Sequence, residues 1–580
     1  MTPSDLDTPD LRDRAIAAAR GECRFDLLLT GARIADPVMQ ELRAADIGLV
    51  GALIASVHAP GTRTDAAGVI DAAGMIVTPG LIDTHMHVES SMVTPETYAA
   101  HVAPRGVTTL VWDPHEFANV AGTDGVDYAA RAAANACARL LPLVPSCVPS
   151  APGYETAGAD FDGNVIAGLL ARDDMHGLAE VMDMGAVISR APRMRGILTA
   201  ALASGKPVCG HARGLTGAEL QAFVTAGIGS DHELTSADDL MEKLRAGLWI
   251  ELRGSHDHLL PDIALALAAL PHCPPTLTLC TDDTFPDELA NAGGLDDMLR
   301  RMIRYGLPPL RALQAATYNA ARKLGRGDLG LVAPGRRADL VLTRSLKDFR
   351  AETVLIDGAP LRQPEPLAMP PRLRNSMALG PVTPEAFDIA ATGKTARLAA
   401  IDRPRFTRWS EISAPVESGR IVLPRGATRI AVLHRHGRVP VVPRVGLLTG
   451  WGDWRGAFAT TVSHDSHNLT VFGADPIDMA AAANALVACG GGMAVAVQGK
   501  VTALLPLPVA GLVSEAPLAE VAAQLVALRA AMDAVVNWQP PYLVFKALVG
   551  ATLACNKGPH QTDLGIADPQ AGRLLSPPLL

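Results

Sequence analysis

The 580-residue sequence lacks several features by which common classes of protein are identified. Its eight cysteines are dispersed and form no CxxC pair, which indicates buried thiols in a reducing compartment and not a disulfide framework. No run of like charges forms an interaction tail, and the formal net charge of -9 argues against nucleic acid or an anionic membrane as a partner. Aromatic residues contribute only 4%, whereas 48% of residues are hydrophobic and 19% charged, as in an ordinary globular protein.

Segments for secretion or membrane insertion are also missing from the sequence. Residues 1–22 are polar and acidic and lack the basic start and apolar stretch of a signal peptide. The longest apolar stretch, near residues 479–497, is interrupted by Asn484 and by the glycines at 490–492, so it is too broken to span a bilayer. We therefore expect a cytoplasmic protein without a membrane partner.

What the chain does contain is a regular alternation of short apolar strands with helical stretches between residues 76 and 330. Eight β-then-α units in roughly 250 residues predict a (β/α)8 barrel of parallel strands. Strand-like segments at 1–75 and 331–362 predict one small β domain built from both flanks of the barrel. The barrel strands are expected to end near Asp83, Trp112, Ser146, Glu180, His211, His232, Leu252 and Asp282.

A third domain is expected after the barrel and its return strands. The proline-rich run at 363–374 predicts a linker. The segment from 375 to 580 carries its own hydrophobic content, with strands near Ile421 and Val441 and a helix at 476–489. The predicted fold class is therefore α/β, with a C-terminal α+β domain added to the barrel.

Potential metal ligands gather at the predicted strand ends, where barrel enzymes place their functional residues. The first strand ends in His85-Met86-His87, and ligand-type residues follow at four other strand ends. A single histidine is more often a hydrogen-bonded core residue than a ligand, but ligands at five of eight strand ends predict a shared site. Imidazole and carboxylate together suit Zn, Mn or Fe(II). The predicted ligands are His85, His87, Glu180, His211, His232 and Asp282.

Such a site predicts metal-dependent hydrolysis. A divalent ion lowers the pKa of bound water towards about 7 and so supplies hydroxide at neutral pH. Two ions can share one hydroxide, and Glu180 is placed to bridge them. Asp282 could bind one ion and accept the proton of the water, which makes it the expected general base. His232 could bind the second ion or orient the substrate.

The sequence around the histidine pair resembles the signature of the amidohydrolase superfamily. The run TPGLIDTHMH at 78–87 carries the likeness, which implies a metal-bearing barrel flanked by a β-sandwich. Longer stretches resemble the adenine deaminases within that superfamily, and they span the barrel and reach into the C-terminal third. Among them are HMHVESSMVTPETYA at 85–99, GHARGLTGAELQAFVTAGIGSDHE at 210–233 and SHDSHNLTVFG at 463–473.

The resemblance implies hydrolysis of adenine to hypoxanthine and ammonia, with hydroxide held by two metal ions attacking C6. It implies a binuclear centre that works best with Mn, although Fe or Zn can occupy it, and a role in purine salvage. Many superfamily members bridge their metals with a modified lysine, whereas this sequence has Glu180 there, as the adenine deaminases do. The matching metal positions are the six residues named above. We expect adenine and water as ligands and a homo-oligomer, with a dimer as the first expectation.

Three further carboxylates lie in the same motifs. Glu89 follows the histidine pair, and Asp113 and Glu116 lie in the DPHE run after the second strand. A role as a loop or capping carboxylate is the alternative for each of them. Attack at C6 moves negative charge onto a ring nitrogen, so the reaction needs an acid near the purine, for which Glu116 or Glu89 could serve.

His464 and His467 form the sharpest motif outside the barrel. Their HxxH spacing could suit a metal, but packing over the barrel mouth or the orientation of a loop explains it equally well. Arg213 stands where one form of the family motif has proline, and ELRGSHDH follows the seventh strand at 251–258. These two features indicate a subgroup and leave the fine substrate preference open.

Two other functions fit the same sequence. The site could act on a different aminopurine or a lactam, or the chain could be a non-catalytic scaffold, although a scaffold is expected to lose ligands and this sequence keeps them all. The HVE run at 87–89 formally matches the HxE of other zinc deaminases. The PCxxC that accompanies it in those enzymes is absent here, which argues against editing of nucleic acid.

Overall fold

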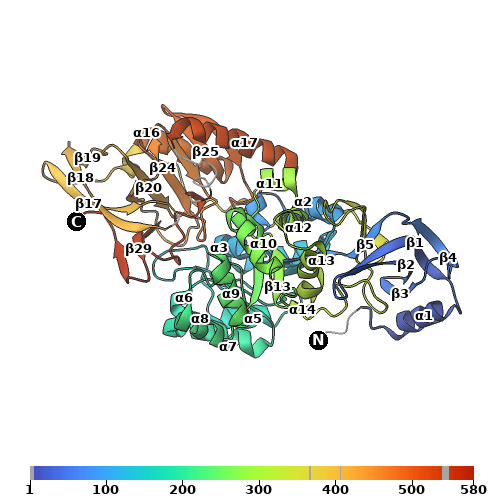
Figure 1. Ribbon diagram of the computed structural model, residues 1–580. Coiled ribbons are helices and arrows are strands. Elements are labelled where there is room, and N and C mark those ends of the chain that lie inside the picture. Colours follow the sequence, from blue (N-terminus) through green and yellow to red (C-terminus); the bar gives the residue numbers. More distant parts are fainter. Residues whose placement is uncertain (1–4, 365–366, 405, 538–545, 547) are drawn as a thin grey trace.

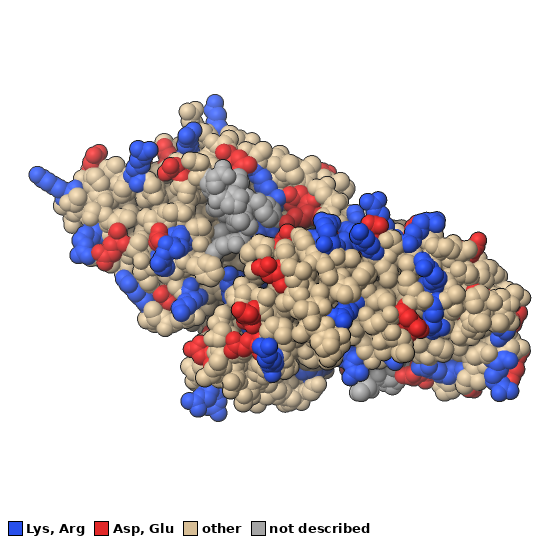
Figure 2. Space-filling view, viewed as in Figure 1, with Lys and Arg blue, Asp and Glu red and all other residues tan. Residues whose placement is uncertain are grey.

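The structure is a computed structural model that describes the whole chain except residues 1–4, 365–366, 405, 538–545 and 547. Figure 1 shows three neighbouring regions, namely a sheet formed near the N-terminus, a central barrel, and a C-terminal domain. Glu365 and Pro366 of the predicted linker lie outside the described residues. None of the described helices is long and apolar enough to cross a membrane. Acidic and basic side chains are interspersed over the face shown in Figure 2.

The central region is a ring of eight parallel strands, which confirms the predicted (β/α)8 barrel. Parallel ladders join β6–β7–β8, β9–β10 and β11–β12–β13. A bridge from Val144 to Leu178 connects the first ladder to the second, and a backbone hydrogen bond from Gly229 to β10 connects the second to the third. A bridge from Met86 to Asp282 closes the ring between the last and the first strands. The third strand ends before the expected Ser146, and the chain then pairs through the single bridge at Val144. The strands are β6 (Leu81–Met86), β7 (Val107–Trp112), β8 (Arg139–Pro142), β9 (Leu178–Val181), β10 (Val208–Gly210), β11 (Ser230–Asp231), β12 (Trp249–Arg253) and β13 (Leu277–Cys280).

Helices cover the outside of the barrel between successive strands, as Figure 1 shows. Their buried faces are rich in leucine, isoleucine and alanine, which pack against the strands in one hydrophobic core. They are α2 (Pro95–Val102), α3 (His115–Ala121), α4 (Thr123–Asn135), α5 (Gly163–Leu170), α6 (Met184–Ser189), α7 (Pro192–Ser204), α8 (Gly217–Thr225), α9 (Ala237–Arg245), α10 (Leu260–Ala268), α11 (Pro286–Ala292), α12 (Leu295–Arg304), α13 (Pro309–Gln314) and α14 (Ala320–Lys323).

An eight-stranded sheet beside the barrel combines strands from both ends of the barrel sequence. Its β1 bends at a bulge between Leu29 and Ala32, so its first half pairs with β4 and its second half with β5. Helix α1 (Pro9–Arg20), which was not expected, packs on this sheet. The strands are β1 (Phe25–Asp36), β2 (Glu41–Val50), β3 (Leu53–His58), β4 (Ala66–Asp71), β5 (Ile76–Pro79), β14 (Leu340–Thr343), β15 (Ala351–Ile356) and β16 (Ala359–Pro360).

The C-terminal domain is built on a nine-stranded sheet with the order β19-β18-β17-β21-β20-β24-β23-β25-β26. The strand expected near Val441 begins instead at Arg444, because Pro440 and Pro443 bracket that segment and cannot donate backbone hydrogen bonds. The sheet strands are β17 (Thr395–Asp402), β18 (Arg408–Glu417), β19 (Arg420–Ile421), β20 (Ala427–Leu433), β21 (Arg444–Thr449), β23 (Ala457–Thr460), β24 (Leu469–Gly473), β25 (Gly492–Val497) and β26 (Lys500–Pro506).

Among the described residues, two α-helices and five short strands complete this domain and join it to the barrel. Helix α17 packs against α11 of the barrel, and its Val521 and Leu525 belong to the same hydrophobic core as the barrel strands. Arg529 of α17 forms an ion pair with Asp287 of α11. The further elements are α16 (Pro476–Cys489), α17 (Leu518–Val535), β22 (Asp453–Trp454), β27 (Val536–Asn537), β28 (His560–Thr562), β29 (Gly565–Asp568) and β30 (Arg573–Leu575).

Candidate active site

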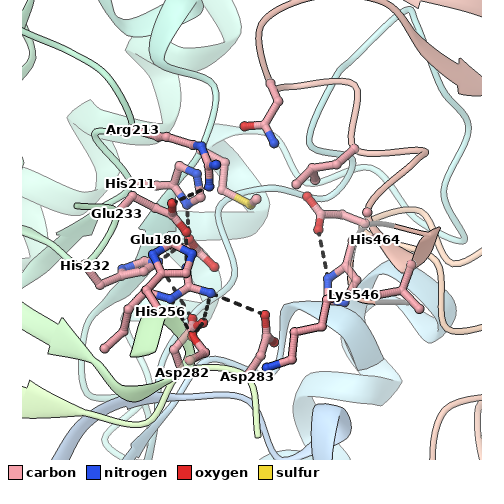
Figure 3. Close-up of a pocket in the computed structure, with 18 of the residues that line it drawn as sticks. Glu180, His211, Arg213, His232, Glu233, His256, Asp282, Asp283, His464 and Lys546 are labelled. Atoms are coloured by element: carbon pink, nitrogen blue, oxygen red, sulfur yellow. Dashed lines mark hydrogen bonds and ion pairs between the residues drawn. The ribbon is translucent and has the colours of Figure 1, made fainter. Parts of the chain in front are cut away.

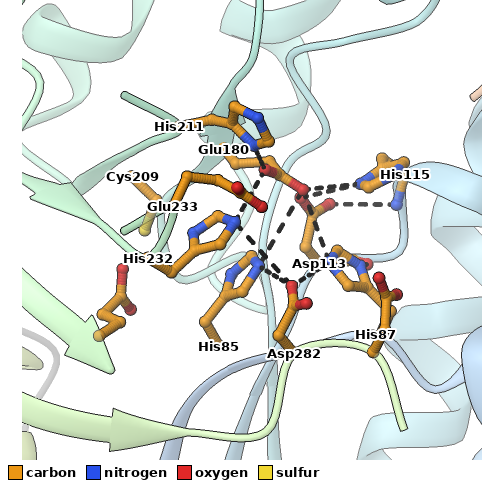
Figure 4. Close-up of polar contacts among 12 residues, drawn as sticks. His85, His87, Asp113, His115, Glu180, Cys209, His211, His232, Glu233 and Asp282 are labelled. Atoms are coloured by element: carbon orange, nitrogen blue, oxygen red, sulfur yellow. Dashed lines mark hydrogen bonds and ion pairs between the residues drawn. The ribbon is translucent and has the colours of Figure 1, made fainter. Parts of the chain in front are cut away.

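The six predicted ligands meet at the carboxyl ends of the barrel strands (Figure 4). Each comes from a strand or from the first residues after it, where the parallel ladder ends and the side chains turn inward. All six residues are buried, and none has more than 5% of its surface exposed. They are His85 on β6, His87 directly after it, Glu180 on β9, His211 after β10, His232 after β11 and Asp282 after β13.

Glu180 lies in the middle of this cluster, and its two oxygens face different histidines. Oε1 is 3.5 Å from His87 Nε2 and 4.0 Å from His85 Nε2. Oε2 is 2.7 Å from His211 Nδ1 and 3.3 Å from His232 Nε2. Burial alone would raise the pKa of Glu180, but His232 and His211 hold it well below its usual value. A carboxylate in this arrangement can bridge two cations.

Asp282 faces the same centre from the last barrel strand. Its Oδ1 lies 3.4 Å from His85 Nε2 and 3.5 Å from His87 Nε2. Its Oδ2 accepts a hydrogen bond from Ser255 Oγ at 3.1 Å and forms an ion pair with Arg253. Burial would raise the pKa of Asp282, but Arg253 and the two histidines keep it well below its usual value, so the carboxylate stays ionised.

The backbone of Asp282 is held in an uncommon conformation. Its φ is +58°, in the left-handed region that residues other than glycine rarely adopt. The strained turn is fixed by a backbone bond from Asp282 N to His85 O at 3.0 Å, across the seam between the last and the first barrel strands. Such strain persists where the surrounding structure over-determines the geometry, and here it aims the carboxylate at His85 and His87.

Several buried ring nitrogens of the cluster have no hydrogen-bond partner among the described residues. They include both nitrogens of His85, Nε2 of His211 and Nδ1 of His232. An unpaired buried polar atom is costly, and the described side chains leave these four ring nitrogens without a partner. Imidazole and carboxylate are donors that Zn, Mn and Fe(II) accept. The residues present therefore fit a divalent metal site.

Asp113 and His115 extend the cluster on one side. His115 Nδ1 lies 3.1 Å from Asp113 Oδ2 and 3.6 Å from Glu180 Oε1. Potential ligand atoms of His87, Asp113, His115 and Glu180 all lie within 4.8 Å of one another. Asp113 was a candidate from the sequence, but His115 was missed although it lies in the same DPHE run. Its position at the first turn of α3, directly after β7, was the signal available.

Glu89 and Glu116 lie behind the cluster and are fully buried. Glu89 accepts hydrogen bonds from Trp112 Nε1 at 2.9 Å and from the Phe117 amide at 3.3 Å. Burial, together with the charge of Glu116, raises the pKa of Glu89 to about 8, and burial also raises the pKa of Glu116. Neither carboxyl is among the described residues that line the adjoining cavity. Their roles in the reaction stay predictions.

A serine connects Glu116 to that cavity. Ser90 Oγ lies 3.4 Å from Glu116 Oε1 and 2.5 Å from Asp283 Oδ1. Asp283 lines the cavity, whereas Glu116 does not. A proton could pass between the buried carboxyl and the cavity along this path. Asp283 and Ser90 were not candidates from the sequence.

The cavity, of about 260 Å³, opens beside the cluster and is lined by both the barrel and the C-terminal domain. Figure 3 shows Glu180 and His232 on one side and His464 on the other. Arg213 also lines it and donates to Glu233 at 2.8 Å, and Glu233 in turn forms an ion pair with Arg253. His467 is fully buried and does not belong to the described cavity lining, so the two histidines of the HxxH motif have different surroundings.

A barrel with a buried cluster of histidines and carboxylates at its strand ends places the chain among the metal-dependent hydrolases. Residues 76–361 match the amidohydrolase family, and residues 404–573 match the adenine deaminase C-terminal domain. The chain is 63% identical over 585 residues to adenine deaminase 2 of Rhizobium meliloti (strain 1021), an alignment that covers 100% of this chain and 98% of the relative. It belongs to the adenine deaminase family, as the motifs predicted.

Other relatives agree over the same length. Adenine deaminase 2 of Agrobacterium fabrum (strain C58) is 59% identical over 584 residues, which cover 100% of this chain and 98% of the relative. Adenine deaminase of Klebsiella pneumoniae (strain 342) is 49% identical over 579 residues, which cover 98% of this chain and 96% of the relative. The likeness therefore includes the barrel and the C-terminal domain together.

Proposed function

We propose that this chain catalyses the hydrolytic deamination of adenine to hypoxanthine and ammonia. The observation that carries the proposal is the meeting of six ligand-type side chains in one buried cluster, in a chain related over its full length to proteins named adenine deaminase. The cavity beside the cluster gives a small heterocycle access to it.

We propose that the cluster holds two divalent ions, with Mn as the native metal and Fe or Zn as ions that the same donors accommodate. His85, His87 and Asp282 would hold one ion and His211 and His232 the other. Glu180 would contact both, which the opposed directions of its two oxygens support. When bound, the ions supply a nucleophile at neutral pH by lowering the pKa of water towards about 7.

Asp282 is proposed as the general base. Its Oδ1 faces the centre of the cluster, and the neighbouring Arg253 keeps the carboxylate ionised and therefore able to accept a proton. The proton taken from the attacking water would return to the departing amino group, which leaves as ammonia. His232 would bind the second ion or orient the purine, since its ring faces both Glu180 and Asp282.

Glu116 is proposed as the acid that relieves the charge on the purine ring nitrogen. Burial raises the pKa of Glu116, which favours the protonated form that an acid requires, and Ser90 and Asp283 form a path from Glu116 to the cavity. Glu89 remains the alternative. Its described contacts are the indole of Trp112 and a backbone amide, neither of which leads to the cavity, so the geometry favours Glu116.

Further proposals concern the setting of the enzyme. Eight free, dispersed cysteines support a reducing compartment such as the cytoplasm, and recovery of purine bases is the proposed cellular use. We also propose a homodimer, which light scattering would test. The division into a β-sandwich from 1–75 and 331–362, a barrel at 76–330 and a C-terminal domain at 375–580 is proposed from the sheet that joins both flanks.

The deciding experiment is turnover of adenine by the Mn-loaded protein, followed as release of ammonia. We expect stoichiometric hypoxanthine and ammonia. Failure with adenine together with turnover of another aminopurine or a lactam would replace the substrate and keep the chemistry. Metal analysis of protein grown with added Mn tests the scaffold alternative separately, because metal well below one ion per chain would contradict a hydrolytic centre.

A further inference from the structure

Residues 463–468, in the loop between β23 and β24, bring side chains of the C-terminal domain to the active-site cavity. His464 of this loop faces the cavity (Figure 3). Asp465 of the loop and His115 of the barrel also line the cavity. The loop contains the HxxH motif, to which neither the proposed metal centre nor the proposed proton path assigns a role.

Asp465 is the unusual member of the loop. It is fully buried, and neither of its carboxylate oxygens has a hydrogen-bond partner among the described residues. His115 Nε2 and His464 Nδ1 lie 3.6 and 3.7 Å from its Oδ1. A buried carboxylate is costly unless opposite charge compensates it, and these two imidazoles are placed to do so.

The two imidazoles connect Asp465 to both parts of the active site. The other ring nitrogen of His115 faces Asp113 at 3.1 Å and Glu180 at 3.6 Å. His464 lies with Nδ1 3.9 Å from Glu116 Oε1. One carboxylate of the C-terminal domain therefore contacts a histidine beside the metal-ligand cluster and a histidine beside the proposed acid.

The position of the loop is fixed from inside the C-terminal domain. Arg435 is fully buried and donates from Nε to His467 O at 2.5 Å and from Nη2 to Ala510 O at 2.8 Å. A Cβ at Gly511 would lie 2.9 Å from Arg435 Nη1, so glycine leaves the space that this guanidinium fills.

The same loop is also tied directly to the barrel. Asn468 Nδ2 donates to Thr156 O, in the loop after β8, at 2.9 Å. With bonds on both sides, the loop has little freedom to move relative to the barrel strands. Asp465 is thus presented to His115 in a defined place, as a group that orients a neighbouring side chain must be.

We propose that Asp465 is a positioning residue of the active site, contributed by the C-terminal domain, which holds His115 and His464 in the orientations that face the ligand cluster and the cavity. Carboxylates that orient histidines beside a metal centre act in this way without binding the metal. The inference rests on the proposed function, because it assigns Asp465 to that reaction. It gives the HxxH loop a role other than metal binding.

The test compares Asp465→Asn with Asp563→Asn in the Mn-loaded full-length enzyme. Asp563 is a matched control, because it is a buried carboxylate of the same domain at the same interface, where it accepts a hydrogen bond from the Thr156 amide at 2.8 Å. It does not belong to the described cavity lining. We expect Asp465→Asn to lower kcat by about 10–100-fold, with KM and metal content near those of the wild type. Asp563→Asn should keep kcat within about threefold of the wild-type value.

Three results would overturn the proposal. The first is a kcat of Asp465→Asn that equals that of the wild type. The second is loss of a metal equivalent in Asp465→Asn, which would make Asp465 a ligand. The third is a loss of kcat in both variants that follows their loss of folded protein. If Asp465→Asn does not fold, His464→Gln decides, because His464 lies at the cavity wall, and an unchanged kcat there would refute the role.

The wild-type measurement separates this inference from the proposed function. Absence of adenine turnover by the wild type would refute the proposed function and the inference that depends on it. Equal turnover by the wild type and by Asp465→Asn would refute the inference alone.

Discussion

The barrel and the C-terminal domain contribute to the active site in different ways. In the barrel, the ends of five different strands converge on one point, where several imidazole nitrogens have no hydrogen-bond partner in the described part of the chain. The nine-stranded sheet of the C-terminal domain is packed mainly with apolar side chains, and it reaches the cavity largely through loops. The difference supports the proposals that the barrel carries the chemistry and that the C-terminal domain encloses the site and orients its side chains. Substitutions in the two regions should therefore lower kcat to different degrees.

The largest effect is expected from Asp282→Asn in the barrel. The substitution removes the proposed base and a proposed ligand at once, while it keeps the size of the side chain. We expect kcat to fall by about 10⁴-fold, the upper end of the range for loss of a general base, with the fold retained. Steady-state kinetics of the Mn-loaded protein, together with circular dichroism, measures both. An active Asp282→Asn enzyme would refute the role of this residue.

The control for this variant is a carboxylate of the same barrel outside the cavity. Glu251 on β12 is fully buried and pairs with Lys323 at 2.7 Å. Glu251→Gln should lower the thermal midpoint, because it leaves a buried ammonium without its counter-charge, and should change kcat little. If Glu251→Gln lost as much kcat as Asp282→Asn, loss of any buried barrel carboxylate would have the same effect. The result for Asp282→Asn would then not support a specific role of Asp282 in the reaction.

A smaller effect should separate Glu116 from Glu89. Both are fully buried, but among the described contacts only Glu116 has Ser90 between it and a residue that lines the cavity. We expect Glu116→Gln to lower kcat by about 100-fold, as for loss of an acid, and Glu89→Gln to lower it by less than about tenfold. The reverse order of the two effects would make Glu89 the acid. Parallel measurement of kcat for both variants decides.

The comparison also shows which parts of the site could be predicted. The ligands at the barrel strand ends follow from a repeating pattern, since each lies where an apolar strand gives way to a polar residue, and all such ends meet at one face. Helix α1 could have been found as well, because Pro9 stands at its first turn and Gly21 ends it with φ of +82°.

Contacts between distant loops could not be derived in the same way. Asp465 meets His115 only because the C-terminal domain packs over the barrel, and no local pattern relates two residues so far apart in sequence. Arg253, beside Asp282, was visible in the ELRGSHDH run, but its ion pair depends on how β12 and β13 turn into their loops. Sequence patterns predicted the ligands at the strand ends, whereas the contacts made by the loops depend on how distant parts of the chain pack together.

The last effect concerns stability and depends on a buried carboxyl between the barrel and the C-terminal domain. Glu155, in the loop after β8, is buried beside the C-terminal domain and accepts hydrogen bonds from Ser150 Oγ and the Ala151 amide, both at 2.8 Å. Burial, reinforced by the nearby charge of Asp465, raises the pKa of Glu155 from 4.5 to about 8. The native interface then holds a neutral Glu155 beside a charged Asp465.

The sign of the resulting pH dependence follows from the raised pKa. Between pH 4.5 and 8 the native protein keeps the Glu155 proton while the unfolded chain releases it, so the free energy of unfolding falls as the pH rises. The slope from this group is at most about 1.4 kcal/mol per pH unit. Glu155→Gln has no such proton, so its stability relative to the wild type should increase across this pH range. Urea unfolding of both proteins at several pH values measures the difference. Parallel pH profiles would mean that Glu155 is ionised in the native state and that the junction between barrel and C-terminal domain accommodates two carboxylate charges, not one.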